Sequence, residues 1–183
     1  SSAASSHGVD GNCWLCLDAK HGSEVPLRRD CSCRGGSGWA HFQCIVEYAK
    51  QKNEAWNGED PDEFIKPWKH CSGCHQLYQN ELVVDLATEF VSFVGENYPD
   101  DQEKHLAALQ RKLAALRNMV ERLQPGQKEE AKQIACQTLS IFEQMKKANQ
   151  SLPNHILKRE AYAYNNLGFF SLVEGTKGGA KIA

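Results

Sequence analysis

Residues 13–74 contain four short segments rich in cysteine: CWLC at 13–16, CSC at 31–33, HFQC at 41–44 and CSGC at 71–74. Zinc is usually held by four tetrahedral ligands, most often thiolate sulfur and imidazole nitrogen. One short segment can supply two ligands to an ion, and a second segment must then supply the other two. Four such segments therefore predict two sites with every position filled, and closed sites of this kind bind structural rather than catalytic zinc.

A disulfide framework in a secreted protein is the alternative explanation for closely spaced cysteines. Seven of the eight cysteines lie in the four segments, and only Cys136 stands apart. His41 is in register with the cysteine pairs, which a disulfide framework would not require, and residues 1–8 lack the apolar core of a signal peptide. These observations favour zinc. Because thiolates must stay reduced to bind metal, we expect a soluble protein of the cytoplasm or nucleus.

The composition argues against two further classes of protein. The formal net charge is −2 over 183 residues, and no basic face is evident, so we expect no nucleic-acid partner. No stretch approaches the roughly 18 consecutive apolar residues that a membrane-spanning helix needs, so we expect no membrane span.

The order of the ligands along the chain is more informative than their number. It reads four cysteines, one histidine and three cysteines, with seven residues between Cys33 and His41. Arg34 and Gly35 follow Cys33, and CIVEY occupies 44–48. In these features, residues 11–80 resemble the RING finger superfamily in its RING-CH (RING-variant) form, found in one class of ubiquitin ligases. The resemblance implies a small zinc-stabilised, RING-like α+β domain that binds two Zn²⁺ ions in an interleaved arrangement, the cross-brace.

The spacing shows that the ligand pairs exist, whereas the resemblance implies how they combine. It assigns Cys13, Cys16, His41 and Cys44 to the first zinc, and Cys31, Cys33, Cys71 and Cys74 to the second. His70 and His75 flank the last pair, and either could replace a cysteine as ligand. Because the cysteine spacing is already complete, we expect neither histidine to bind zinc.

The resemblance also implies a function, that of a RING-type ubiquitin ligase without a catalytic nucleophile of its own. Such a domain binds a ubiquitin-conjugating enzyme that carries ubiquitin as a thioester, and orients it for attack by a substrate lysine. By their place in the family motif, Leu15 and Tyr48 would contact the conjugating enzyme, and His75 could contact ubiquitin. The alternative role is packing around the zinc loops for Leu15 and Tyr48, and a solvated side chain for His75.

Two non-enzymatic functions remain open. Plant homeodomain readers share the ligand order, but they usually have four or five residues before the histidine and a tryptophan two places before the seventh ligand. Here seven residues precede His41, and Trp68 lies three places before Cys71, which favours RING-CH. A scaffold that has kept the zinc fold without ligase activity is the other possibility, because Ser72 stands where ligases often have proline and His75 where they often have a basic residue.

The remainder of the first half is expected to support the zinc domain. Apolar residues at helical spacing predict a short helix at 42–50. Residues 51–70 form a long insertion, in which Phe64 and Trp68 predict a small satellite core. A connecting helix is predicted over 81–97, with Asn80 as its N-cap and Gly95 as its stop signal.

Residues 98–183 are predicted to be α-helical, whereas residues 1–10 read as a disordered tail. Apolar residues recur every three or four positions between 106 and 123, after a capping residue at Asp100 and before the breaker Gln124-Pro125-Gly126. Further helices are predicted at 128–148, with Cys136 as a packed thiol, and at 155–172.

The last predicted helix resembles part of a tetratricopeptide repeat. Tyr164, Leu167 and Gly168 are followed by Ala180, and in such repeats a small residue on the first helix meets an alanine on the second. Helix pairs of this kind bury their faces by stacking, so we expect a truncated repeat region that binds the protein substrate. A plain helical bundle is the alternative.

Overall fold

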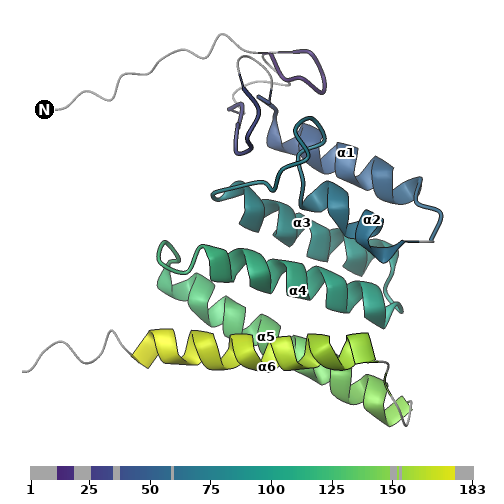
Figure 1. The fold of residues 1–183 in the computed structure, drawn as a ribbon, viewed down its shortest axis with the longest axis vertical. Helices are drawn as coiled ribbons and strands as arrows, with labels where there is room; N and C mark the ends of the chain where they lie inside the picture. The colour runs from purple at the N-terminus through teal and green to yellow at the C-terminus, as the bar shows by residue number, and fades with distance from the viewer. Residues whose placement is uncertain are drawn as a thin grey trace, which may run out of the picture. The chain divides into compact units, whose positions relative to one another are not determined.

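The computed structural model describes residues 12–18, 26–34, 38–58, 60–148, 152 and 154–175, apart from five side chains within helices (Pro125, His155 and residues 173–175). The expected tail at 1–10 lies outside these ranges. The chain divides into two compact units, residues 1–82 and 83–183. Figure 1 shows the helices of each unit, and the helical region expected after the zinc-ligand segments is present.

The first unit combines short helices with loops that carry the zinc-ligand segments. Its helices are α1 (Phe42–Glu54), α2 (Pro61–Ile65) and the 3-10 helix η1 (Lys66–Trp68). In the part of this unit that the structure describes, β structure is limited to two isolated bridges, Arg28 with Ala40 and His70 with Leu77. The α+β class is therefore not confirmed. A ligand follows one residue of each bridge: His41 follows Ala40, and Cys71 follows His70. After these ligands the chain enters a helix or a turn, so neither bridge extends into a strand.

Helix α1 is longer than the helix expected at 42–50 because its last turn has a packing partner. It buries Ile45, Ala49 and Asn53, which are four residues apart and therefore share one face. The Asn53 amide donates to the carbonyl oxygen of Phe64 at 2.7 Å, and its oxygen accepts from the indole N–H of Trp68. A buried amide left without partners would cost about 1–3 kcal/mol, so these bonds fix the end of α1 against α2 and η1.

The insertion forms the satellite core that its apolar residues predict. Phe64 and Trp68 are 2% and 0% exposed, and the rings of Trp56 and Phe64 pack with centroids 5.0 Å apart. The carboxylate of Asp60 accepts from the backbone N–H of Asp62 at 2.9 Å and so caps the start of α2. This prediction is confirmed.

The connecting helix, α3 (Leu82–Asn97), is present, but its two predicted end signals are wrong. Asn80 has φ +52°, outside the extended conformation of an N-cap, and its amide donates to the Asp30 carboxylate at 3.0 Å. Gly95 lies inside the helix, where an exposed glycine costs only about 1 kcal/mol relative to alanine. That cost is too small to end the helix, because Phe93 and Val94, just before Gly95, are buried, and α3 runs on to Asn97.

The second unit also contains α4 (Gln102–Asn118), α5 (Pro125–Ala148) and α6 (Asn154–Gly175), and two of the expected boundaries change. The cap of α4 is Asp101 rather than Asp100, since the Asp101 carboxylate accepts from the Lys104 backbone N–H at 3.0 Å. Pro125 opens α5 instead of only ending the preceding helix, and the first turn is where proline is tolerated, because its missing N–H would have no partner there.

Helices α4, α5 and α6 lie side by side (Figure 1), and their side chains form a shared apolar core. One cluster contains Leu109, Leu113, Leu116, Leu123, Ala131, Ile134, Ala135 and Phe170, and α3 adds Val84 and Val91 to its edge. A second cluster contains Leu106, Phe142, Met145, Leu152, Ile156 and Ala163. Ion pairs of 2.5 Å join Lys112 to Glu130 and Lys146 to Glu160 beside these clusters. The expected helical seams are therefore confirmed as the core of this unit.

Two further expectations for the second unit have different outcomes. The prediction that Cys136 is a packed thiol is wrong, because this residue is exposed. Two residues span 200° on a helix, so Cys136 points away from the side on which Ile134 is buried. The tetratricopeptide pattern stays a prediction. It requires Gly168 to meet Ala180, but Ala180 lies outside the described residues, and no described atom lies within 4 Å of a Cβ added at Gly168.

The isolated segment 83–183 is expected to be helical and to fold without metal, because the core formed by its described residues contains no zinc ligand. A segment that starts at residue 98 should be less stable by about 1–3 kcal/mol, since it lacks the contacts of Val84 and Val91. Circular dichroism and urea unfolding of both segments, with and without a chelator, are the measurements. A coil spectrum for 83–183, or a chelator-dependent one, would contradict the prediction.

Candidate metal centre

The first group of ligand atoms consists of Cys13, Cys16, His41 and Cys44, whose atoms all lie within 4.8 Å of one another. The Nδ1 atom of His41 lies 3.5 Å from the Cys16 sulfur and 3.7 Å from the Cys44 sulfur. Zinc bonds of about 2.3 Å to sulfur and about 2.0 Å to nitrogen place tetrahedral ligand atoms about 3.5–3.8 Å apart. The spacing of this group therefore fits one zinc ion.

The second group consists of Cys31, Cys33, Cys71 and Cys74, and its ligand atoms also lie within 4.8 Å of one another. The sulfur atoms of Cys33 and Cys71 are 3.7 Å apart, again the separation expected across a tetrahedral zinc. The backbone of Gly38 packs directly against this group and has φ +93°. A Cβ atom added at Gly38 would lie 2.5 Å from the Cβ of Cys33. A side chain at position 38 would force the ligand loop to move.

The two C-x2-C segments have the same local turn. The backbone N–H of Leu17 donates to the Cys13 carbonyl at 2.7 Å, and that of His75 donates to the Cys71 carbonyl at 2.8 Å. Leu17 and His75 both have positive φ, 63° and 58°, which is uncommon for residues other than glycine. Each turn thus returns the chain sharply after its second cysteine, so both sulfurs of the segment face one point.

The electrostatics of both groups favour a bound cation. Burial opposes ionisation of Cys13, but hydrogen bonds from the backbone N–H groups of Cys16, His41 and Leu15 lower its pKa to about 6. Burial and the neighbouring thiols of Cys16 and Cys13 raise the pKa of Cys44 to about 12. In a metal-free group, one ionised thiol therefore hinders ionisation of the next.

The second group shows the same division. Burial opposes ionisation of Cys74, but the backbone N–H of Gln76 and other hydrogen bonds lower its pKa to about 7. Burial raises the pKa of Cys31 and of Cys33, and the Cys71 thiol adds to this in both. A divalent cation removes the repulsion between thiolates, so the donor set of each group fits Zn²⁺.

The family comparison agrees with this geometry. Residues 13–74 match the model of the RINGv family, described as the RING-variant domain. This segment is a RING-variant domain. No curated protein and no solved structure matches the chain. The domain's two groups are those that the resemblance implied, neither includes His70 or His75, and the expectation of two zinc ions is confirmed.

Leu15 and Tyr48 both line one groove of the RING-variant domain, with a volume of about 420 Å³. The other lining residues are Cys16, Gln43, Cys44, Glu47 and Gln51. The Tyr48 ring meets the edge of Trp14 at a centroid distance of 6.4 Å, and Lys52 Nζ lies 5.6 Å from its centroid. Sequence reasoning missed Trp14, although its place between two zinc ligands was a signal that it borders the same surface. His75 does not line the groove and is exposed.

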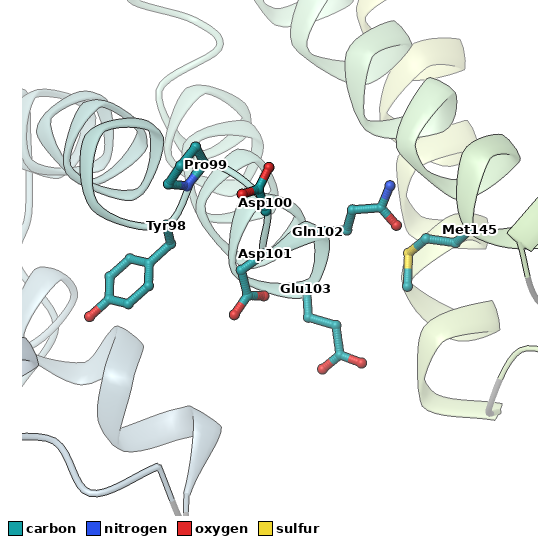
Figure 2. Close-up of a pocket in the computed structure, with 7 residues that line it drawn as sticks. All are labelled: Tyr98, Pro99, Asp100, Asp101, Gln102, Glu103 and Met145. Atoms are coloured by element: carbon teal, nitrogen blue, oxygen red, sulfur yellow. The ribbon is translucent and has the colours of Figure 1, made fainter.

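The second unit has a separate, acidic hollow at the start of α4, with a volume of about 590 Å³. Figure 2 shows Tyr98, Asp101 and Glu103 pointing to one side of the chain, whereas Gln102 points toward Met145. Asp101 already caps α4 and pairs with Lys104, so this carboxylate has a structural role.

In the described part of the chain, no helix is both long and apolar enough to cross a membrane.

Acidification from about pH 7.5 to about pH 5.5 is expected to release zinc, because protons and metal compete for the same sulfur atoms. Cys44 must lose a proton when zinc binds, since its pKa in the metal-free group is about 12. Each proton displaced per ion makes the apparent affinity fall about tenfold for every pH unit of acidification. A zinc-sensitive dye measures the released metal, and a zinc content independent of pH over this range would contradict the prediction.

Proposed function

We propose that the chain is a RING-CH ubiquitin ligase, in which a cross-brace of two zinc ions supports a surface for a ubiquitin-conjugating enzyme. The observation that carries the proposal is the groove of the RING-variant domain. Leu15 and Tyr48, which the family motif nominates for this contact, come from separate segments and line the same groove. The zinc ions supply structure only, because protein side chains fill all four positions of each site.

The chemistry of the groove suits contact with a protein rather than reaction with a small molecule. Two apolar side chains are surrounded by the polar side chains of Gln43, Glu47 and Gln51. Gln43 donates to the Glu47 carboxylate at 3.0 Å, and Glu47 also pairs with Lys50 at 3.7 Å. An apolar centre with a polar rim is the usual arrangement of a protein interface.

In this proposal the domain contributes orientation. The ring contacts of Trp14 and Lys52 hold Tyr48 in place before a partner binds, which lowers the entropy lost on association. A conjugating enzyme docked on Leu15 and Tyr48 would keep its ubiquitin thioester where a substrate lysine can attack, and such positioning accelerates transfer without a nucleophile on the ligase. His75 is exposed on the same unit and would contact ubiquitin. The second unit would bind the substrate.

A scaffold or reader without ligase activity is the second candidate. The observation that favours it is the last ligand segment, where Ser72 replaces proline and His75 replaces a strongly basic residue. Both changes would weaken the contact with a conjugating enzyme that carries ubiquitin.

An autoubiquitination assay against a panel of conjugating enzymes separates the two candidates. The reaction contains the zinc-loaded chain, a ubiquitin-activating enzyme, ubiquitin and ATP, and we expect ubiquitin chains with at least one conjugating enzyme. A chain that binds two zinc ions but transfers no ubiquitin with any member of the panel would instead support the scaffold or reader.

A further inference from the structure

The outward face of α6 is apolar and nearly uncharged. Its exposed residues include Leu157, Tyr164 and Leu172, which are 42%, 55% and 73% exposed. Ala161 and Gly168 lie between them and are also exposed, so the five residues form a stripe at spacings of three and four. Among the exposed side chains described on α6, only Lys158 is charged.

Helix α5 of the same unit shows what a water-facing surface looks like in this protein. The exposed side of α5 carries several charges, among them Glu129, Glu143, Lys146 and Lys147. The opposite side of α6 is already buried against α5 and α4 through residues such as Ile156, Ala163 and Phe170. A helix that is apolar on both sides normally has protein on both sides.

Four of the five residues of the stripe are placed symmetrically along the helix, whereas the counterpart of Tyr164 is Asn165. Leu157 and Leu172 are equally far from the midpoint between residues 164 and 165, and so are Ala161 and Gly168. If a second α6 lay antiparallel across the stripe, each Leu157 would meet a Leu172, and each Ala161 would meet a Gly168. The small pairs lie nearer the centre, and nothing stands within 4 Å of a Cβ added to Gly168, so the two backbones could approach closely there.

We infer that the stripe binds a second copy of this chain, with the two α6 helices antiparallel about a two-fold axis near Tyr164 and Asn165. An isologous contact of this kind requires that a surface be complementary to itself, and the two symmetric pairs of the stripe satisfy this. Its one charge is compatible with the pairing, since the two copies of Lys158 would be about 20 Å apart along the helices. This inference does not depend on ubiquitin ligase activity.

The size of the stripe indicates that the pair is weak. From Leu157 to Leu172 a helix extends about 22 Å, and a strip of this length covers a few hundred Å² on each copy. Stable interfaces bury roughly 1,200 Å² or more in total, so association should be reversible and depend on concentration. Sedimentation equilibrium should show an average mass that rises from 20.5 kDa toward twice that value between about 10 µM and about 1 mM chain.

A charge-pair experiment tests both the contact and its register. Leu157→Lys and Leu172→Glu each place a charge opposite a leucine of the second copy, so each variant alone should remain a monomer at every concentration. An equimolar mixture should associate again, because the introduced lysine and glutamate then face each other and the other two leucines keep their contact. Ser140→Lys on the exposed face of α5 is the matched control and should associate like the parent.

Circular dichroism and zinc content should be unchanged in all three variants, since each substituted residue is exposed. A parent chain that stays at 20.5 kDa throughout overturns the inference, and this is the result expected if another segment or another protein covers the stripe. Association that survives in both single variants, or a mixture that fails to associate, overturns it as well.

Discussion

Removal of zinc with a chelator is expected to unfold the RING-variant domain while α4, α5 and α6 stay helical. Metal binding and folding are one equilibrium in such domains, and each structural zinc contributes about 10–16 kcal/mol in finger peptides. A whole domain is usually stable by only about 5–15 kcal/mol. The satellite core around Phe64 and Trp68 cannot replace the metal, because it lies in the insertion, and the described parts of the ligand loops have no helix or extended strand that would hold them without zinc.

Single substitutions make the same test specific. Cys31→Ser removes a ligand of the second group, and we expect it to lose at least one ion and to expose residues 26–34 to protease. Cys136→Ser is the matched control, because this cysteine is exposed on α5 and belongs to neither group, so both ions should be retained. Metal analysis in reducing buffer, together with circular dichroism, is the measurement. A parent chain with one zinc or none would contradict the two-site structure.

The sequence predicted the ligands better than their arrangement, for a physical reason. A C-x2-C spacing is local, so it identifies Cys13 with Cys16, or Cys71 with Cys74, as pairs. Which pairs share an ion depends on how the loops between them fold, and spacing does not encode this. The resemblance to RING-CH domains supplied the grouping, and the structure brings the same residues together.

The wrong expectations were decided by contacts that a local pattern does not contain. Asn80 has the residue type of an N-cap, but its amide binds Asp30, fifty residues earlier in the chain. Gly95 has the residue type of a stop signal, but the packing of Phe93 and Val94, the buried residues just before it, keeps α3 helical to Asn97. Cys136 lies among buried residues in the sequence, and only the rotation of α5 against its neighbours exposes it.

Leu15→Ala and Tyr48→Ala are each expected to reduce ubiquitin transfer about thirtyfold without loss of zinc. Neither side chain is a ligand, and both line the groove of the RING-variant domain, so the metal sites can close without them. Apolar anchors of protein interfaces contribute about 1–4 kcal/mol each. Loss of about 2 kcal/mol lowers the occupancy of a weak complex about thirtyfold, since every 1.4 kcal/mol is a factor of ten.

Because positioning is the whole contribution of such a ligase, the rate of transfer should fall in proportion to occupancy. Leu77→Ala is the matched control: Leu77 is 47% exposed on the same unit and does not line the groove, so this variant should transfer ubiquitin at the parent rate. The measurements are the initial rate of ubiquitin transfer at several concentrations of the conjugating enzyme, and the zinc content of each variant. A higher concentration of the conjugating enzyme should restore the rate of the groove variants, since they lose binding rather than chemistry. If both groove variants keep two zinc ions and match the Leu77→Ala rate, then Leu15 and Tyr48 only pack against the zinc loops, and the conjugating enzyme binds elsewhere.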